Sequence, residues 1–393
     1  MKKLLILTSC LLSASITWGQ SSPQKKIQTQ FIMAEDGSTV ELDEGTFIFT
    51  ASLSMEGKKG VTIKGKGKDK TILVFKGQTE GAEGIRVSNA QNITIADLTV
   101  QDSKGDAIKT MNVNGITFKN VKTEWTGKPK KENGAYGLYP VQCDNVLIDG
   151  CEAIGASDAG IYVGQSRNIV VRNSRAYHNV AGIEIENSIN ADVYDNEATE
   201  NTGGILVFDL PDLVQKKGGN VRVFKNNVHD NNYPNFAPEA NTVGKVPDGT
   251  GILILATNNV EVFENQIINN KTVGTGIISY FMTETPIKDK DYYPYSTQIY
   301  IHDNTYERQS VRTTSRRRMG KMYRFKLKFG TDVPHIQWDG ITDKNNPATV
   351  LCIKNNKNGS FANLDAENDF KNVSRDLSKH NCELERLKMA VLK

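Results

Sequence analysis

The chain has 393 residues and a formal net charge of +3, and 38% of its residues are hydrophobic. Outside residues 1–19, no stretch is both apolar and long enough to span a membrane, which excludes a helical membrane protein. The near balance of charge gives no reason to expect nucleic acid as a partner.

Residues 1–19 have the features of a secretory signal peptide. Lys2 and Lys3 precede an apolar run that starts at Leu4 and ends before Gln20. We therefore expect an exported protein, periplasmic or secreted, whose formal charge falls from +3 to +1 when the two lysines are removed. A lipoprotein modified at Cys10 is the less favoured alternative, because the apolar run continues past that residue.

Residues 22–34 place Ile27 and Phe31 four positions apart. This spacing predicts a short amphipathic helix with both side chains on one face. Such a helix would cover the open end of a strand stack, which otherwise exposes unpaired backbone groups. Residues 36–42 would then begin the first strand-containing unit.

Eight short segments of alternating apolar residues recur in the middle of the chain. Their centres are Ile95, Phe118, Ile148, Val171, Val193, Val223, Val262 and Ile301. Successive centres are 23, 30, 23, 22, 30, 39 and 39 residues apart, which indicates a unit of 22–23 residues with some insertions. Alternation with period two is typical of strands, and a short fixed repeat is typical of a solenoid.

Two residue types recur at fixed places in these units. Asparagines follow the strand centres by three residues and predict bends in left-handed backbone: Asn196, Asn226, Asn265 and Asn304. A glycine before an apolar residue opens a second strand and predicts a tight corner: Gly160, Gly182, Gly204 and Gly251.

The repeat predicts an all-β fold, a single-stranded right-handed parallel β-helix with a short N-terminal capping helix and a loop-rich C-terminal extension. A β-propeller needs about 40–50 residues per blade, so gaps as short as 22 residues exclude it. The β-helix is predicted over residues 20–307, followed by a basic segment and C-terminal cap over residues 308–393.

The C-terminal region carries two further signals. Residues 308–330 hold nine basic and no acidic residues. We interpret them as a solvated connecting segment, with contact to an anionic glycan or lipopolysaccharide as the alternative. Cys352 and Cys382 are predicted to form a disulfide between the last strand-like run and the tail, whereas Cys151 is expected to be buried in the core.

Outward positions of the second strand predict one polar and aromatic face. In successive units they hold Lys109, Tyr139, Tyr162, Glu184 and Leu206. A substrate-binding face is predicted from Tyr139, Gln142, Tyr162, Gln165 and Glu184, since rings pack on sugars while polar groups bind hydroxyls and carboxylates. Insertions over residues 127–134, 209–213 and 231–249 would build walls beside it. The alternative is that these side chains only solvate the outer surface.

Three carboxylates predict a metal site on the same face. Glu184, Glu186 and Asp209 lie in adjacent units, and oxygen ligands of this kind suit Ca²⁺. Calcium is the one cofactor that the sequence suggests. The five histidines show no zinc-binding spacing.

The asparagine bends, the glycine columns and the stretch Ala159–Ser166 resemble the pectin-lyase-like superfamily of right-handed β-helices. Over roughly residues 35–305 the chain is similar to exported bacterial parallel β-helix repeat proteins. Relatives include polysaccharide lyases, mannuronan C5-epimerases and the periplasmic protein that helps mature nitrous oxide reductase. Copper handling of the last kind would need a Met or His cluster, which the sequence lacks.

The stretch Ala135–Gln142 resembles the epimerase signature Tyr-Gly-Phe-Asp-Pro-His-Glu. Tyr136 and Pro140 match it, whereas Tyr139 replaces the Asp and Val141 the His. The resemblance implies Tyr136 as an acid or base, with Lys104 as the upstream cation. Lys109 is the other lysine that we assign to catalysis, and a nearby lysine would activate Tyr136 by lowering its pKa.

Two functions follow from the sequence. The first is a lyase or epimerase that abstracts the proton next to a uronate carboxylate in an acidic polysaccharide. A lyase fits better, because one tyrosine could serve as both base and acid. The alternative is a non-catalytic glycan-binding or envelope accessory protein with the same fold.

Overall fold

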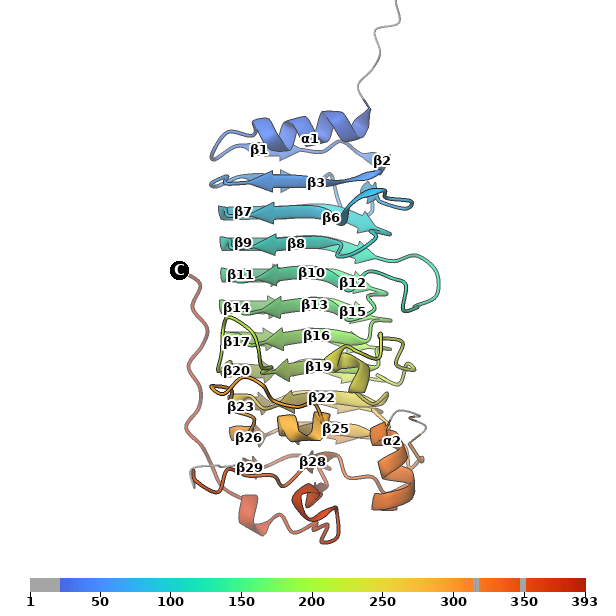
Figure 1. Cartoon of the computed structure of the whole chain (residues 1–393), viewed down its shortest axis with the longest axis vertical. Helices are drawn as coiled ribbons and strands as arrows, with labels where there is room; N and C mark the ends of the chain where they lie inside the picture. The colour runs from blue at the N-terminus through green and yellow to red at the C-terminus, as the bar shows by residue number, and fades with distance from the viewer. Residues whose placement is uncertain (1–21, 314, 316–317, 347–350) are drawn as a thin grey trace, which may run out of the picture.

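The computed structural model describes residues 22–313, 315, 318–346 and 351–393. The predicted signal peptide lies outside the described residues. Strands of successive coils pair in parallel and stack into a long rod, so the predicted all-β parallel β-helix is confirmed (Figure 1). Within the described part of the chain, no helix is long and apolar enough to cross a membrane.

Each coil contributes strands to two sheets, which we call sheet A and sheet B. Sheet B contains one strand per coil: β3 (Ala51–Glu56), β6 (Glu80–Ser88), β8 (Ile108–Met111), β10 (Tyr136–Val141), β13 (Ala159–Gly164), β16 (Ala181–Glu186), β19 (Gly203–Phe208), β22 (Thr250–Leu255), β25 (Val273–Ile278), β28 (Ile336–Trp338) and β30 (Phe361–Asn363).

Sheet A contains two columns of strands joined by a bend. The first column is β1 (Thr39–Glu41), β4 (Thr62–Lys64), β7 (Gln91–Gln101), β9 (Asn114–Glu124), β11 (Asp144–Asp149), β14 (Arg167–Arg172), β17 (Ile189–Tyr194), β20 (Gly219–Phe224), β23 (Asn258–Phe263), β26 (Thr297–His302) and β29 (Leu351–Lys354). The second column is β2 (Gly45–Ile48), β5 (Thr71–Val74), the later halves of β7 and β9, β12 (Glu152–Ile154), β15 (Arg175–Tyr177), β18 (Glu197–Thr199), β21 (Asn227–His229), β24 (Gln266–Ile268) and β27 (Thr305–Glu307).

The register keeps equivalent side chains of successive coils in one line. Val171 pairs with Val193, Val193 with Val223, and Val223 with Val262. All four are fully buried. The period-two alternation of the sequence therefore produces a continuous apolar core inside the rod, and the sequence prediction of these strand centres is confirmed.

The predicted asparagine column forms a buried hydrogen-bonded ladder. Asn226 donates from Nδ2 to the carbonyl of Val193, and its Oδ1 accepts the backbone N–H of Asn196 at 3.1 Å. Left-handed backbone is found one residue earlier, for example at Asp195 and Lys225, so the predicted conformation of the asparagines was wrong. A second ladder, which the sequence analysis missed, runs through Asn179, Asn201, Asn231 and Asn270.

The glycine column exists for a different reason from the predicted tight corner. Gly182 lies inside β16 without a positive φ, and a Cβ there would stand 2.6 Å from the carbonyl oxygen of Gly204 and 2.8 Å from Nδ2 of Asn201. Gly160, Gly204 and Gly251 are crowded in the same way by their own ladder asparagines. The glycines therefore leave room for the second ladder.

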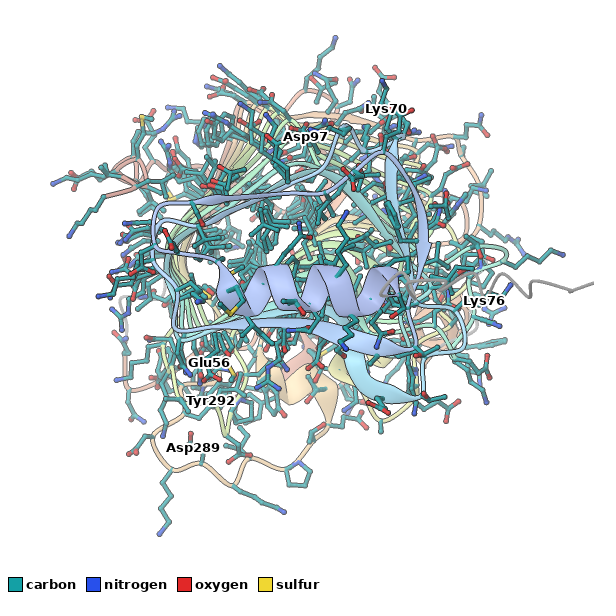
Figure 2. The ribbon with its side chains drawn as sticks, turned by 90° about the horizontal axis from the view of Figure 1, so that it is seen from above. Glu56, Lys70, Lys76, Asp97, Asp289 and Tyr292 are labelled. Carbon is teal, nitrogen blue, oxygen red and sulfur yellow. A yellow bond between two sulfur atoms is a disulfide. The ribbon has the colours of Figure 1, made fainter. Side chains whose placement is uncertain are left out.

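The predicted N-terminal capping helix is confirmed as α1 (Pro23–Met33). Ser22 caps it by accepting the N–H of Lys25 at 3.3 Å, and Ile27 and Phe31 face the core. Viewed along the rod, α1 lies across the first coil (Figure 2). The helix thus covers the apolar end of the stack.

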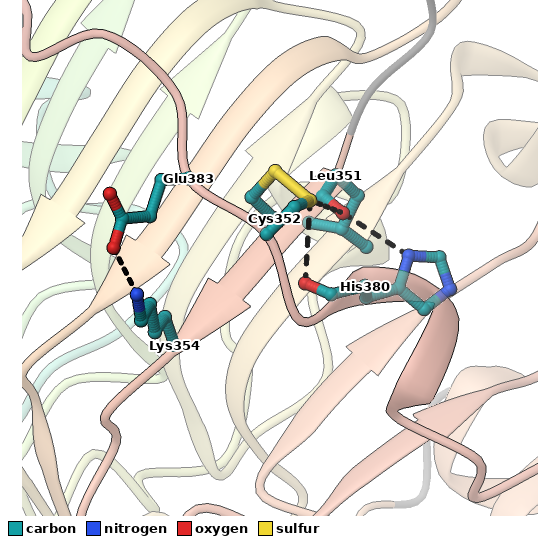
Figure 3. The surroundings of a disulfide bond; sticks show 6 residues. Leu351, Cys352, Lys354, His380 and Glu383 are labelled. Atoms are coloured by element: carbon teal, nitrogen blue, oxygen red, sulfur yellow. Dashed lines mark hydrogen bonds and ion pairs between the residues drawn. A yellow bond between two sulfur atoms is a disulfide. The ribbon is translucent and has the colours of Figure 1, made fainter.

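The stack continues past the predicted boundary at residue 307. Strands β28, β29 and β30 extend both sheets, so the predicted C-terminal cap includes two more partial coils. Short helices fill the connections: η1 (Thr242–Lys245), η2 (Tyr280–Thr283), α2 (Arg318–Met322), η3 (Tyr323–Leu327), η4 (Ala366–Asn368) and η5 (Ser378–His380). The Cys352–Cys382 disulfide is present, as predicted, while Cys143 and Cys151 are buried and free (Figure 3).

Candidate functional site

The outer face of sheet B carries the predicted row of polar and aromatic residues. Lys109 pairs with Tyr139 on one side and Arg86 on the other. Tyr162 pairs with Glu184, which pairs with Leu206. The four residues Lys109, Tyr139, Tyr162 and Glu184 therefore follow one another along the rod, as the sequence predicted.

Loops cover only the later half of this face. Two loops cover it, one over residues 231–249 with η1 and one over residues 279–296 with η2. Their side chains form a second apolar cluster with Leu206 and Leu253 of sheet B, to which the loops contribute Val243, Val246, Tyr280 and Tyr292. Figure 2 shows Tyr292 and Asp289 on the same side of the rod as Glu56 of sheet B. The earlier coils, with Arg86, remain exposed.

Three tyrosines meet at the boundary between the open and covered halves. The ring centroid of Tyr136 lies 4.4 Å from that of Tyr139 and 4.5 Å from that of Tyr162. The ammonium of Lys109 lies 4.8 Å from the Tyr139 ring centroid. Tyr136 and Tyr139 are half-buried, but Tyr162 is only 4% exposed.

Carboxyl groups surround these tyrosines. Glu186 accepts a hydrogen bond from the Tyr162 hydroxyl at 2.6 Å, and Asp158 accepts one from Asn241 at 2.8 Å. Burial raises the pKa of Asp158 and of Glu186 to about 7 in each case, and the bond from Tyr162 partly opposes the shift at Glu186. Burial also raises the pKa of Glu184 well above its ordinary value. The site therefore holds carboxyl groups that exchange protons near neutral pH.

Two more carboxyl groups lie at its edges. Burial raises the pKa of Asp106 to about 6, although Lys109, with its Nζ 4.0 Å from Oδ2 of Asp106, favours the ionised form. Burial also raises the pKa of Asp209 to about 7, and its Oδ1 accepts the N–H of Gly218 at 2.9 Å. Asp209 thus joins the two ends of the loop between β19 and β20.

The predicted activation of Tyr136 by a lysine is wrong. Burial and the negative charges of Asp158, Glu184 and Glu186 raise the pKa of Tyr136 well above its ordinary value. A phenol in this environment remains protonated and donates hydrogen bonds. Carboxyl groups, rather than this tyrosine, are the bases that the site provides.

The structure gives no support to the predicted calcium site, which stays a prediction. Among the described residues, no three histidine, cysteine, aspartate or glutamate side chains converge where they could hold a metal ion. Glu186 accepts a hydrogen bond from Tyr162, and Asp209 accepts one from Gly218. Glu184 is 1% exposed, and its Oε2 has no hydrogen-bond partner among the described residues.

The structure also places the other predicted site residues. Lys104 is an exposed residue whose backbone N–H donates to Gln78 at 3.2 Å. Gln165 accepts the N–H of Val214 at 3.0 Å and so anchors the loop after β19. Tyr162 and Glu184 are too buried to touch a ligand in this structure. Gln142 lies half-buried just past β10, in left-handed backbone.

Sequence reasoning missed Arg86, Asp106 and Asp158. Arg86 precedes Lys109 in the outward row, so the same repeat could have found it. Asp158 lies one residue before Ala159, the register partner of Tyr136. The loop over residues 279–296 gave no signal, because its packing on sheet B depends on contacts between distant coils.

Comparison with known proteins places the chain in a family. The family described as "Right handed beta helix region" matches residues 59–215 and 130–286, which together cover more than half of the chain. The chain belongs to this right-handed β-helix family. It is a parallel β-helix protein of the pectin-lyase-like superfamily. No curated protein sequence is significantly similar to it.

Several solved structures share the fold. The A-module of mannuronan C-5 epimerase AlgE4 from Azotobacter vinelandii has a TM-score of 0.56 at 17% identity, over 86% of this chain and 92% of that chain. The AlgE6 A-module from the same organism has a TM-score of 0.52 at 16% identity, with the same coverage of both chains. A DFA-IIIase variant from Arthrobacter chlorophenolicus A6 has a TM-score of 0.50 at 10% identity, over 89% and 84%. At these identities the likeness shows the shared fold.

Proposed function

We propose that the protein modifies a polysaccharide by proton transfer on the outer face of sheet B, where the covering loops begin. The observation that carries this proposal is the group of carboxyl side chains with near-neutral pKa beside half-buried tyrosines. A general acid or base works best when its pKa lies close to the working pH.

Glu186 is the residue that we assign to proton transfer. Its side chain is half-buried, its pKa is about 7, and Tyr162 fixes one oxygen by a 2.6 Å hydrogen bond. A Cβ at Gly164 would stand 2.2 Å from the Tyr162 hydroxyl, so that glycine allows the ring to reach Glu186. Tyr136, kept protonated by its surroundings, would donate a hydrogen bond to the reacting sugar, and the proton that Glu186 removes would pass to the leaving glycosidic oxygen.

The substrate that we propose is acidic. Arg86 and Lys109 occupy paired positions on adjacent strands, about 4.8 Å apart along the rod. A polymer lying along the rod would present successive carboxylates to these cations and a sugar ring to Tyr139. The A-modules of two mannuronan C-5 epimerases share the fold, which supports a uronate polymer as the first substrate to test.

The proposal includes export, although the predicted signal lies outside the described residues. The Cys352–Cys382 disulfide supports an oxidising compartment. A protein that acts on an extracellular polysaccharide would require such a location.

The test looks for both products of proton abstraction. In D₂O, an epimerase should introduce deuterium next to the carboxylate of polymannuronate or polygalacturonate, which NMR detects, whereas a lyase should form an unsaturated end, which ultraviolet absorbance detects. We expect Glu186→Gln to lower the rate by about 10²–10⁴-fold, the usual contribution of a general acid or base. Glu56→Gln is the matched control, because Glu56 is an exposed carboxylate on an earlier strand of the same sheet.

Equal loss in both variants would reject the proposed chemistry. So would a parent protein that forms neither a deuterated nor an unsaturated product on any uronate polymer. Binding without turnover would instead support the second candidate, a glycan-binding protein. That candidate is favoured by one observation, the near-complete burial of Tyr162 and Glu184. A reducing-end assay on neutral glucans would reveal hydrolysis, the other reaction that paired carboxyl groups support.

A further inference from the structure

The C-terminal tail follows a long path on the outside of the rod. After the disulfide at Cys382, residues 383–393 run back along sheet A, and the C-terminus lies beside the earlier coils in Figure 1. Seven consecutive strands of the first column, from β29 to β11, lie along this path. A segment of eleven residues thus contacts coils that are far apart in sequence.

Backbone N–H groups of the tail bind side chains at regular intervals. Leu387 donates to Oε2 of Glu261 at 3.1 Å, and Ala390 donates to Oδ2 of Asp192 at 3.2 Å. Lys393 donates to Oδ1 of Asn145 at 3.1 Å. The donors are three residues apart. The acceptors lie on β23, β17 and β11, which are every second strand of the first column of sheet A.

The spacing of donors and acceptors fits because the rise of an extended peptide matches the rise of the coils. Three residues of extended polyproline-type backbone rise about 9.3 Å. Two coils of paired strands rise about 9.6 Å. An extended peptide therefore stays in step with the rod over several repeats. Leu384, Leu387 and Ala390 are half-buried with the same period, whereas Met389 is 68% exposed.

The acceptors are held in place by the rod itself. Arg222 binds Asp192 with two hydrogen bonds of 2.8 and 2.6 Å, and His302 contacts Glu261 at 3.1 Å. Asp192 and Glu261 are each no more than 2% exposed. Oδ2 of Asp192 accepts from both Arg222 and the tail, whereas Glu261 uses Oε1 for His302 and Oε2 for the tail. Contacts within the rod thus fix the position of both acceptors.

The start of the tail is fixed more strongly than its end. The disulfide joins Cys382 to β29, and Lys354 of the same strand pairs with Glu383 (Figure 3). Arg386 pairs with Glu261 and lies 4.4 Å from the ring centroid of Phe263. Beyond Arg386 the contacts are the backbone hydrogen bonds and the half-buried apolar side chains.

We propose that the outer face of sheet A is a docking track for an extended peptide, and that the chain's own residues 384–393 occupy it as a strap across the coils. The track recognises backbone N–H groups at every third residue through Glu261, Asp192 and Asn145. The Cys352–Cys382 disulfide holds the start of the strap beside β29.

Hydrogen exchange on the full-length protein tests the strap. The amides of Leu387, Ala390 and Lys393 should exchange about tenfold more slowly than that of Met389, because each protected amide forms a hydrogen bond to a buried or fixed acceptor. Leu387→Pro removes one donor and should release Ala390. Met389→Pro is the matched control, because no hydrogen bond from the Met389 amide is present among the described residues.

Amides of β16 report whether the rod stays folded in both variants. A labelled peptide of residues 384–393 should bind the Leu387→Pro protein, as followed by fluorescence anisotropy, and should bind the parent at least tenfold more weakly, since the parent's track is filled. Uniform exchange along the tail, equal effects of the two prolines, or no peptide binding to Leu387→Pro would each overturn the proposal.

Discussion

At the scale of single residues, burial determines what the carboxyl groups of sheet B can do. Asp158, Glu186 and Asp209 have pKa values of about 7, which burial raises from ordinary values near 4. The sequence predicted a role for Glu186 and Asp209, but as calcium ligands. Sequence position alone does not reveal how much solvent a side chain loses when distant loops cover it.

These raised pKa values predict how stability changes with pH. Each group is protonated in the folded chain at a pH where the unfolded chain has already released the proton. Their contribution to the free energy of unfolding is complete below about pH 4 and is lost as the pH rises through about 7. The urea midpoint should therefore fall over this range, and Asp158→Asn, which cannot ionise, should reduce the fall.

Asp144→Asn is the control for this prediction, because Asp144 is exposed. It should leave the pH dependence of the midpoint unchanged. If Asp158→Asn and the parent lose stability in parallel between about pH 4 and pH 8, the buried carboxyl at Asp158 has an ordinary pKa.

At the scale of elements, the two asparagine ladders connect successive coils at their bends. Each ladder residue satisfies a buried carbonyl of an earlier coil and a backbone N–H, as Asn226 does for Val193 and Asn196. The sequence predicted the first ladder from its spacing. It missed the second, although Asn201, Asn231 and Asn270 repeat at the same spacing, each five residues after an asparagine of the first ladder.

Asn226→Ala should destabilise the protein by about 2–4 kcal/mol, because it leaves a buried N–H and a buried carbonyl without partners. Chemical unfolding of the purified variant would measure the loss. Asn227→Ala is the matched control, since its side chain is exposed and the change should alter the free energy of unfolding by no more than about 0.5 kcal/mol. Similar losses in both variants would argue against the ladder as the source of stability.

At the scale of the whole molecule, the rod has two ends that must be closed. Helix α1 covers the first coil through Ile27 and Phe31, and the segment around η5 packs Leu377 and His380 against the last coils. In a solenoid each coil contacts mainly its neighbours, so loss of a cap exposes strand edges and apolar core together.

Phe31→Ala should remove about 3–5 kcal/mol of packing from the N-terminal coils and lower the melting temperature. We also expect concentration-dependent association, visible by light scattering, because the uncovered edge can pair with a second chain. Ile32→Ala, at a side chain that is 59% exposed on the same helix, should change neither property. A monomeric, equally stable Phe31→Ala protein would show that the cap is dispensable.

The sequence by itself determined the β-helix, its capping helix, the disulfide and the row from Lys109 to Glu184. The β-helix and the row follow from short-range patterns, since a strand alternates with period two and a coil repeats at one length. The disulfide follows from the expected export and the positions of the cysteines. Only the tertiary structure decided which of those side chains are open to solvent, where the carboxyl pKa values lie and which face the tail covers. The physical reason is that the burial of these side chains depends on loops and a tail from distant coils. A local sequence pattern does not specify that packing.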